Sequence, residues 1–174
     1  MEKADSIVAQ SESKKLIIGW FSFTCSEDST ILLTELLNDH LDEWKKVVEF
    51  RYLKALKTKN SFVGLDVAFV EGAISSEKQA WELARIRKNA KYLVAIGACA
   101  CTGMPSSSRN SFNPDKISDK IKGYLEKFHY SDKVKKLEDI VKVDDKVEGC
   151  PMNVEAFLAV LQKYLVLFEV VKNA

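Results

Sequence analysis

The sequence predicts a doubly wound α/β domain, with a mostly parallel sheet of four or five strands and helices on both faces. Short apolar runs of strand length alternate along the chain with longer segments of helical periodicity. These runs are almost continuously apolar, as in parallel strands that are buried on both faces. The 174 residues are enough for one core, and no repeat divides them. We therefore expect a polar N-terminal lead over 1–14 and a single domain over 15–174.

Each expected element has a local signal. Apolar runs predict strands over 16–23, 47–56, 63–70 and 92–98, with a short edge strand over 140–143. Apolar residues spaced three and four apart predict helices over 26–41, 76–88, 115–128 and 153–171. Ser26 and Asn153 are expected N-caps, and Ser76 with Gln79 fits a capping box. The segment 102–114, rich in serine and proline, has the composition of a loop.

Composition excludes several classes of function. Lysine plus arginine number 26 and aspartate plus glutamate number 25, so the charge balance favours neither a nucleic-acid nor an acidic membrane partner. The first 15 residues contain acids and no long apolar run, so no export signal is expected. No apolar run approaches the ~18–20 residues of a membrane span. We expect a cytoplasmic protein with reduced thiols.

Four cysteines carry the chemical signal. Cys25 follows the first expected strand, Cys99 and Cys101 follow the fourth, and Cys150 lies between the last expected strand and the last helix. Carboxyl ends of parallel strands meet at one edge of a sheet, where ligands bind in open α/β folds. A single buried cysteine is more often a small hydrophobic residue than a ligand. All four at the same edge favour convergence on one ligand.

An iron-sulfur cluster fits this pattern better than a structural zinc ion. Zinc sites use cysteine pairs at Cys-x2–4-Cys spacing, which the chain lacks, whereas clusters accept ligands from distant loops. We therefore predict a cubane [4Fe-4S] cluster. Cys99 and Cys101 would share a face of a continuing strand but seldom both reach one cluster, so one of them is expected beside the site or merely packed. Glu71, at the end of the third strand, is a candidate to accept hydrogen bonds or protons beside the cluster.

Four segments occur in the order seen in one protein family: Gly19–Ser29, Asp66–Ala73, Ala95–Pro105 and Val147–Met152. In these segments the chain resembles the small subunits of nickel-iron hydrogenases and the related cluster-bearing subunit of NADH:ubiquinone oxidoreductase. The resemblance extends from Lys15 onward, and its specific parts are the Gly-x-Cys-Ala and Gly-Cys-Pro segments. It implies a flavodoxin-like domain that binds the proximal [4Fe-4S] cluster.

The resemblance also implies roles for single residues. Cys25, Cys99 and Cys150 match cluster-binding cysteines, and Glu71 matches the glutamate of a Glu-Gly step. In this match Cys25 is the second cysteine of a Cys-x-x-Cys motif, and Ser22 stands in place of the first. The fourth ligand is therefore Cys101, the Ser22 oxygen, or absent, as in a three-cysteine or [3Fe-4S] variant.

The function implied by the resemblance is electron transfer in a short, cytoplasmic nickel-iron hydrogenase. The small subunit would hold one cluster, and a partner large subunit would hold the nickel-iron site. Electrons would pass to a diaphorase or ferredoxin-like partner, and the small subunit would not be catalytic alone. Two alternatives stay open. One is a cluster subunit of a complex I-like oxidoreductase whose large subunit lacks nickel; the other is a non-redox, flavodoxin-like binding module.

Overall fold

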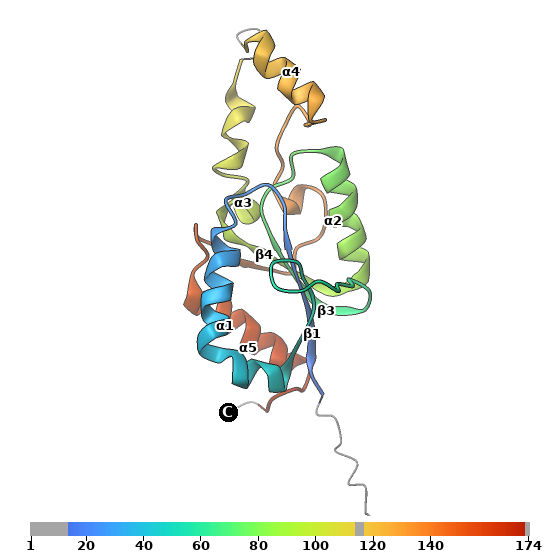
Figure 1. Ribbon diagram of the computed structural model, residues 1–174, viewed down its shortest axis with the longest axis vertical. Coiled ribbons are helices and arrows are strands. Elements are labelled where there is room, and N and C mark those ends of the chain that lie inside the picture. The colour runs from blue at the N-terminus through green and yellow to red at the C-terminus, as the bar shows by residue number, and fades with distance from the viewer. Residues whose placement is uncertain (1–13, 114–116, 173–174) are drawn as a thin grey trace, which may run out of the picture.

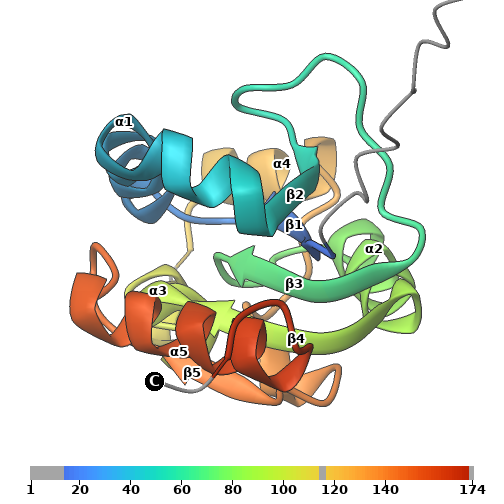
Figure 2. The same ribbon diagram turned by 90° about the horizontal axis from the view of Figure 1, so that it is seen from below.

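The computed structural model describes residues 14–113 and 117–172. Figure 1 shows the sheet at the centre of the domain. Its five parallel strands have the order β2-β1-β3-β4-β5, and all five are labelled in Figure 2. They are β1 (Leu16–Ser22), β2 (Val48–Leu53), β3 (Leu65–Glu71), β4 (Ala90–Ile96) and β5 (Asp145–Val147). The chain passes from β1 to β2 on one side and then returns to β3 on the other, which confirms the predicted doubly wound α/β fold.

Helices cover both faces of the sheet (Figure 2). Helices α1 (Asp28–Val47) and α5 (Val154–Leu167) pack on one face, where Trp20, Phe69 and Phe157 form the aromatic centre of the core. Helix α2 (Glu77–Asn89) packs on the other face. Strand β3 lies in the middle of the sheet and is buried along its whole length, as its continuous apolar sequence predicts.

The segment after β4 leaves the layered body. It forms α3 (Gly97–Thr102), the 3-10 helix η1 (Ser106–Ser111) and α4 (Asp119–Lys127), and α4 stands beyond the carboxyl ends of the strands (Figure 1). No side chain of α4 is buried. The Arg109 guanidinium donates to the carbonyl oxygen of Ser131 at 2.6 Å, which joins the outgoing and returning parts of this excursion. The returning part contains a 3-10 turn, η3 (Leu137–Asp139).

Several expected element boundaries were wrong, and two of these errors lie directly before the cysteines that follow β4 and β5. The edge strand is Asp145–Val147 rather than 140–143, because Ile140, Val141 and Val143 pack into the core while residues 145–147 pair with β4. The fourth strand ends at Ile96, and 97–102 is helical.

One expected N-cap and one expected capping box are absent from the structure. Helix α1 begins at Asp28 and has no local side-chain cap, so Ser26 is not its N-cap. Ser76 caps α2 as expected, accepting from the Gln79 backbone N–H, but the Gln79 side chain accepts from Ser75 N–H and does not complete a capping box. Asn153 caps α5 as predicted.

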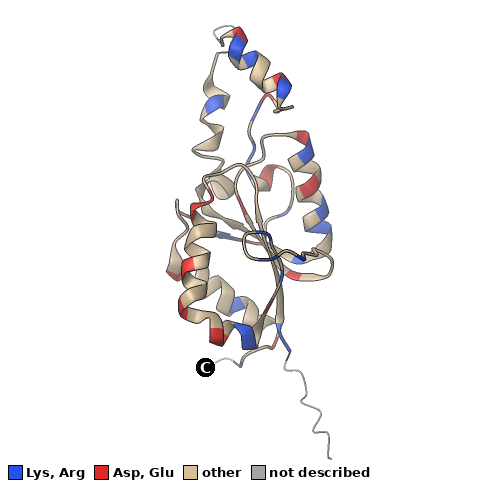
Figure 3. Ribbon diagram, viewed as in Figure 1, with Lys and Arg blue, Asp and Glu red and all other residues tan. Residues whose placement is uncertain are grey.

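Charged residues of both signs are interspersed along the exposed helices (Figure 3). In the described part of the chain, no helix is long and apolar enough to cross a membrane.

Candidate functional site

Three of the four cysteines line one small pocket at the carboxyl ends of the strands. Cys25 comes from the β1–α1 loop, Cys99 from α3 after β4, and Cys150 from the loop after β5. The pocket interior holds about 10 Å³, room for one water molecule, so the cysteines surround a shallow site and not a deep cavity. The remaining lining residues are Ser26, Asp28, Ser29, Glu71, Gly72, Ile96, Gly97, Ala98 and Gly149.

Backbone hydrogen bonds hold the three loops against one another. Thr24 and Ala73 exchange two N–H···O bonds of 2.9 and 3.0 Å, which join the Cys25 loop to the end of β3. Ala98 N–H donates to the Gly149 carbonyl at 2.7 Å, which joins the Cys99 and Cys150 segments. Met152 N–H donates to the Ser29 hydroxyl at 3.2 Å and closes the circle. The cysteines are therefore positioned by the backbone around them.

Glycine allows the loops to approach this closely. Gly72 has φ +93°, and a Cβ there would lie 2.9 Å from the backbone of Phe23 and Thr24. Gly149 has φ +112°, and a Cβ there would lie 2.5 Å from the Pro151 carbonyl oxygen. At both positions the backbone conformation favours glycine, and a side chain would clash with the neighbouring backbone.

The three cysteines differ in exposure. Cys99 is buried, Cys25 is partly buried, and Cys150 is exposed at the mouth of the pocket. Burial, with a further contribution from the negative charge of Glu71, raises the pKa of the Cys25 thiol from 9.0 to about 12. Without a metal, Cys25 is therefore protonated at neutral pH. Metal binding there must displace that proton, since the thiolate is the ligand form.

The structure does not bring Cys101 to this pocket. Because 97–102 is a helical turn and not a continuing strand, residues 99 and 101 point about 200° apart around its axis. The Cys101 sulfur lies 3.6 Å from the Ala95 carbonyl and 3.7 Å from the Val147 carbonyl, within the apolar cluster on the α2 face. Burial raises the pKa of this thiol to about 11. In this structure Cys101 has the environment of a packed core cysteine.

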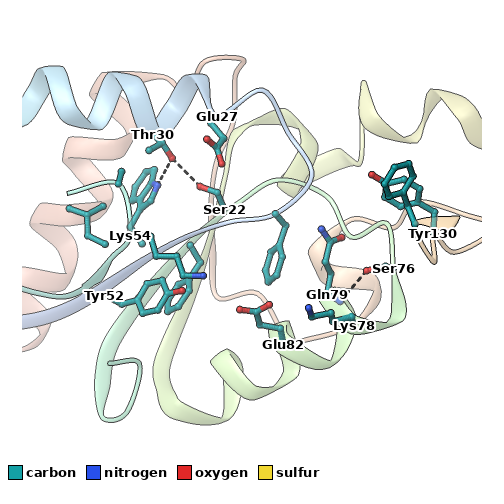
Figure 4. Close-up of a pocket in the computed structure, with 16 residues that line it drawn as sticks. Ser22, Glu27, Thr30, Tyr52, Lys54, Ser76, Lys78, Gln79, Glu82 and Tyr130 are labelled. Carbon is teal, nitrogen blue, oxygen red and sulfur yellow. Dashed lines mark hydrogen bonds between the residues drawn. The ribbon is translucent and has the colours of Figure 1, made fainter. Parts of the chain in front are cut away.

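Ser22 also lies away from the cysteines. Its hydroxyl is 3.1 Å from that of Thr30, and both residues line a second pocket of about 660 Å³ beyond the ends of β1 and β2 (Figure 4). That pocket contains no cysteine among its lining residues. Thr30 also accepts from the Trp20 indole N–H at 2.8 Å, so a serine at position 22 belongs to a buried polar network.

Glu71 lines the cysteine pocket and holds the start of α1. It is 4% exposed, and its two carboxylate oxygens accept from Ser29 N–H at 3.0 Å and the Thr30 hydroxyl at 2.7 Å. The carboxylate of β3 therefore supplies the N-terminal hydrogen bond that no local cap provides. The predicted hydrogen-bonding residue is present, and its partners belong to the helix.

The donor set suits an iron-sulfur cluster. Soft sulfur ligands favour clusters, and most of the residues between the cysteines are glycine, alanine or serine, with Asp28, Glu71 and Ile96 as the exceptions. Within the described residues, no group of three or more His, Cys, Asp or Glu side chains is arranged around one metal ion. Cluster ligands need no such arrangement, because each binds a different iron. The three cysteines therefore supply soft donors of the kind that a cluster binds, and the exposed Cys150 leaves the site open on one side.

Sequence reasoning missed two polar residues at this site. Asp28 lines the cysteine pocket at the first position of α1. The Ser106 hydroxyl lies 3.2 Å from the Cys99 sulfur and 3.2 Å from the Thr24 carbonyl. The three-residue spacing from Cys25 could have pointed to Asp28. No sequence signal pointed to Ser106, which lies in a segment expected to be an irregular loop.

Fold and site together define a flavodoxin-like α/β domain with a cysteine-lined rim. A similar fold occurs in a crystal structure of NAD+-reducing [NiFe]-hydrogenase, with a TM-score of 0.73 and 22% identity; the match covers 91% of this chain and 96% of that one. The [NiFeSe]-hydrogenase of Desulfomicrobium baculatum gives a TM-score of 0.56 at 16% identity, covering 85% of this chain and 61% of that one.

Two proteins with similar sequences are also hydrogenase subunits. The chain is 30% identical over 113 residues to the NAD-reducing hydrogenase HoxS subunit delta of Cupriavidus necator, covering 55% of this chain and 53% of that protein. It is 27% identical over 152 residues to the sulfhydrogenase 2 subunit delta of Pyrococcus furiosus, covering 83% and 60%. The chain therefore spans little more than half the length of these two relatives.

A match to a family model shows to which protein family the chain belongs. The model for the 20 kDa subunit of NADH:ubiquinone oxidoreductase matches residues 25–164. The chain belongs to this family, which confirms the resemblance inferred from its cysteine-bearing segments.

Proposed function

We propose that this protein is the electron-transfer small subunit of a cytoplasmic hydrogenase-like oxidoreductase. The observation that carries the proposal is the meeting of Cys25, Cys99 and Cys150, from three separate loops, at one shallow pocket. The names of the relatives, which are hydrogenase subunits, support a nickel-iron large subunit as partner. A diaphorase or ferredoxin-like subunit would exchange electrons with this protein.

The residues of the pocket have distinct roles in this proposal. Cys25, Cys99 and Cys150 would hold one [4Fe-4S] cluster, which supplies one-electron transfer when bound. The exposure of Cys150 leaves the site open to a partner surface. Glu71 keeps the start of α1, and with it the Cys25 loop, against the end of β3.

Family membership also favours a second candidate, a cluster subunit of a complex I-like oxidoreductase whose large subunit lacks nickel. The two candidates share the cluster and differ in the partner. Co-purification with a nickel-containing large subunit supports the first, and a large subunit without nickel supports the second.

The test of the cluster is anaerobic purification with measurement of iron and acid-labile sulfide. We expect a brown protein with broad absorbance near ~400 nm and stoichiometric iron. A colourless, iron-free protein with four alkylatable thiols would instead support the non-redox binding module and contradict both candidates.

Ser106 is expected to tune the reduction potential. Once Cys99 is a thiolate ligand, its sulfur can accept a hydrogen bond from the Ser106 hydroxyl. The Thr24 carbonyl, which loses the Ser106 hydroxyl, keeps its hydrogen bond from Ala73 N–H. Hydrogen bonds to cluster sulfurs raise the potential. Ser106→Ala should therefore make the potential measured by redox titration more negative without loss of iron.

The matched control is Ser108→Ala. Its hydroxyl lies in the same 3-10 helix and bonds to the Pro105 carbonyl and the Met104 sulfur, not to a cysteine. An unchanged potential in Ser106→Ala, or an equal shift in Ser108→Ala, would refute the role of Ser106.

A further inference from the structure

We propose that the carboxylate of Asp28 is the fourth protein ligand of the cluster, beside Cys25, Cys99 and Cys150. This inference rests on the proposed cluster and names a ligand that neither the cysteine count nor the family resemblance supplies. It predicts a mixed set of three thiolates and one oxygen.

The two residues expected from the sequence to complete the set are turned elsewhere. Cys101 is 4% exposed and packs among the apolar residues of the α2 face. Ser22 lines the other pocket, where its hydroxyl meets Thr30 (Figure 4). Neither residue is among those that line the cysteine pocket.

Two carboxylates line the pocket, and only one has a free oxygen. Both oxygens of Glu71 accept hydrogen bonds from the start of α1. Asp28 accepts at Oδ2 from the Ser26 hydroxyl at 2.7 Å, and within the described residues no other hydrogen bond or ion pair engages its side chain. Asp28 is only partly buried, so its remaining oxygen can bind a metal without breaking a core contact.

Spacing supports the same residue. Asp28 follows Cys25 by three positions, the spacing of a Cys-x-x-Cys ligand pair, and it opens α1 directly after the cysteine loop. The family match begins at Cys25, so it includes Asp28 and leaves Ser22 outside. The structure therefore places a carboxylate, in a cysteine-like position, on the wall of the pocket that holds the other three ligands.

The chemistry of an oxygen ligand gives a measurable signature. Carboxylate oxygen is a harder ligand than thiolate and binds iron in a sulfur environment less tightly. The iron held by Asp28 should be the most labile of the four. One-electron oxidation by ferricyanide should release it as Fe2+ and leave a [3Fe-4S]+ cluster, which electron paramagnetic resonance detects.

The experiment compares four full-length proteins with clusters reconstituted anaerobically: wild type, Asp28→Ala, Asp28→Cys and Glu27→Ala. We expect Asp28→Ala to convert to the three-iron form at least about tenfold faster than wild type. Asp28→Cys should convert more slowly than wild type and keep four irons. Glu27, the adjacent exposed acid, is absent from the cysteine pocket lining, so Glu27→Ala should behave as wild type.

Asp28→Asn provides a check on folding, because it keeps the size of the side chain and an oxygen for Ser26. It should fold normally and lose iron as fast as Asp28→Ala. Equal conversion rates in wild type, Asp28→Ala and Asp28→Asn would overturn the ligand assignment and leave the cluster proposal standing. A wild-type protein that takes up no iron would overturn both.

Discussion

Replacing Cys25 with alanine should abolish cluster incorporation. Cys25 is partly buried in a loop fixed by the paired bonds between Thr24 and Ala73, so its loss removes a thiol that the backbone holds in place at the pocket. Loss of a direct ligand should lower the iron content by at least about tenfold. Mutation of residues that only orient a metal ligand already lowers metal affinity by about 10–100-fold. Cys150→Ala should have the same effect. Iron and sulfide analysis of the anaerobically purified variants measures it.

Cys101→Ala is the matched control. This cysteine lies in the same α3 turn as Cys99 but packs among apolar residues. It should keep the full iron content and cost about 1 kcal/mol of unfolding free energy, as expected for removing a small buried group. Full loss of iron in Cys101→Ala would show that the α3 turn rearranges when metal binds.

The second large effect is expected at Gly149. Alanine there combines a positive φ of +112° with a Cβ only 2.5 Å from the Pro151 carbonyl oxygen. The backbone must shift, so we expect a loss of about 2–3 kcal/mol in unfolding free energy. The Gly149 carbonyl also accepts from Ala98 N–H, so the shift should separate Cys150 from Cys99 and reduce iron binding.

Alanine at Gly123 should have the opposite effect on the free energy of unfolding. It lies on exposed helix α4, and a Cβ there meets nothing within 4 Å. Gly123→Ala should therefore stabilise by about 0.5–1 kcal/mol through helix propensity and leave iron binding unchanged. Urea unfolding of both variants gives the comparison. Equal stabilities for Gly149→Ala and wild type would show that this loop is less constrained than its geometry indicates.

The fold was predictable because continuous apolar strands and amphipathic helices are signals within short segments. Val67, Phe69 and Val94 belong to runs that only a buried sheet accommodates. The edge strand was misplaced because Val141 and Val143 look like strand residues but pack against the core, while residues 145–147, of which only Val147 is apolar, pair with β4. Edge pairing depends on backbone position more than on side-chain type.

The meeting of three cysteines was predictable where they follow strands, and the placement of the fourth was less so where the backbone changes direction. Cys25, Cys99 and Cys150 meet because the carboxyl ends of β1, β4 and β5 meet. Cys101 was harder to place, because β4 gives way to a helical turn at Gly97, whose φ of +80° alters the direction of the chain. The hydrogen bonds of Glu71 to α1 and of Ser106 to Cys99 join distant segments and leave no local signal.

The separation of the three cysteines along the chain links iron supply to folding. The pocket requires β1, β4 and β5 to be assembled, so it does not exist in the unfolded chain, and the binding of a cluster there would be coupled to folding. Once bound, the cluster would join three loops that only weak backbone bonds otherwise hold together. It would favour the folded state by mass action. Iron starvation would then leave cells with a looser, more easily degraded form of this protein.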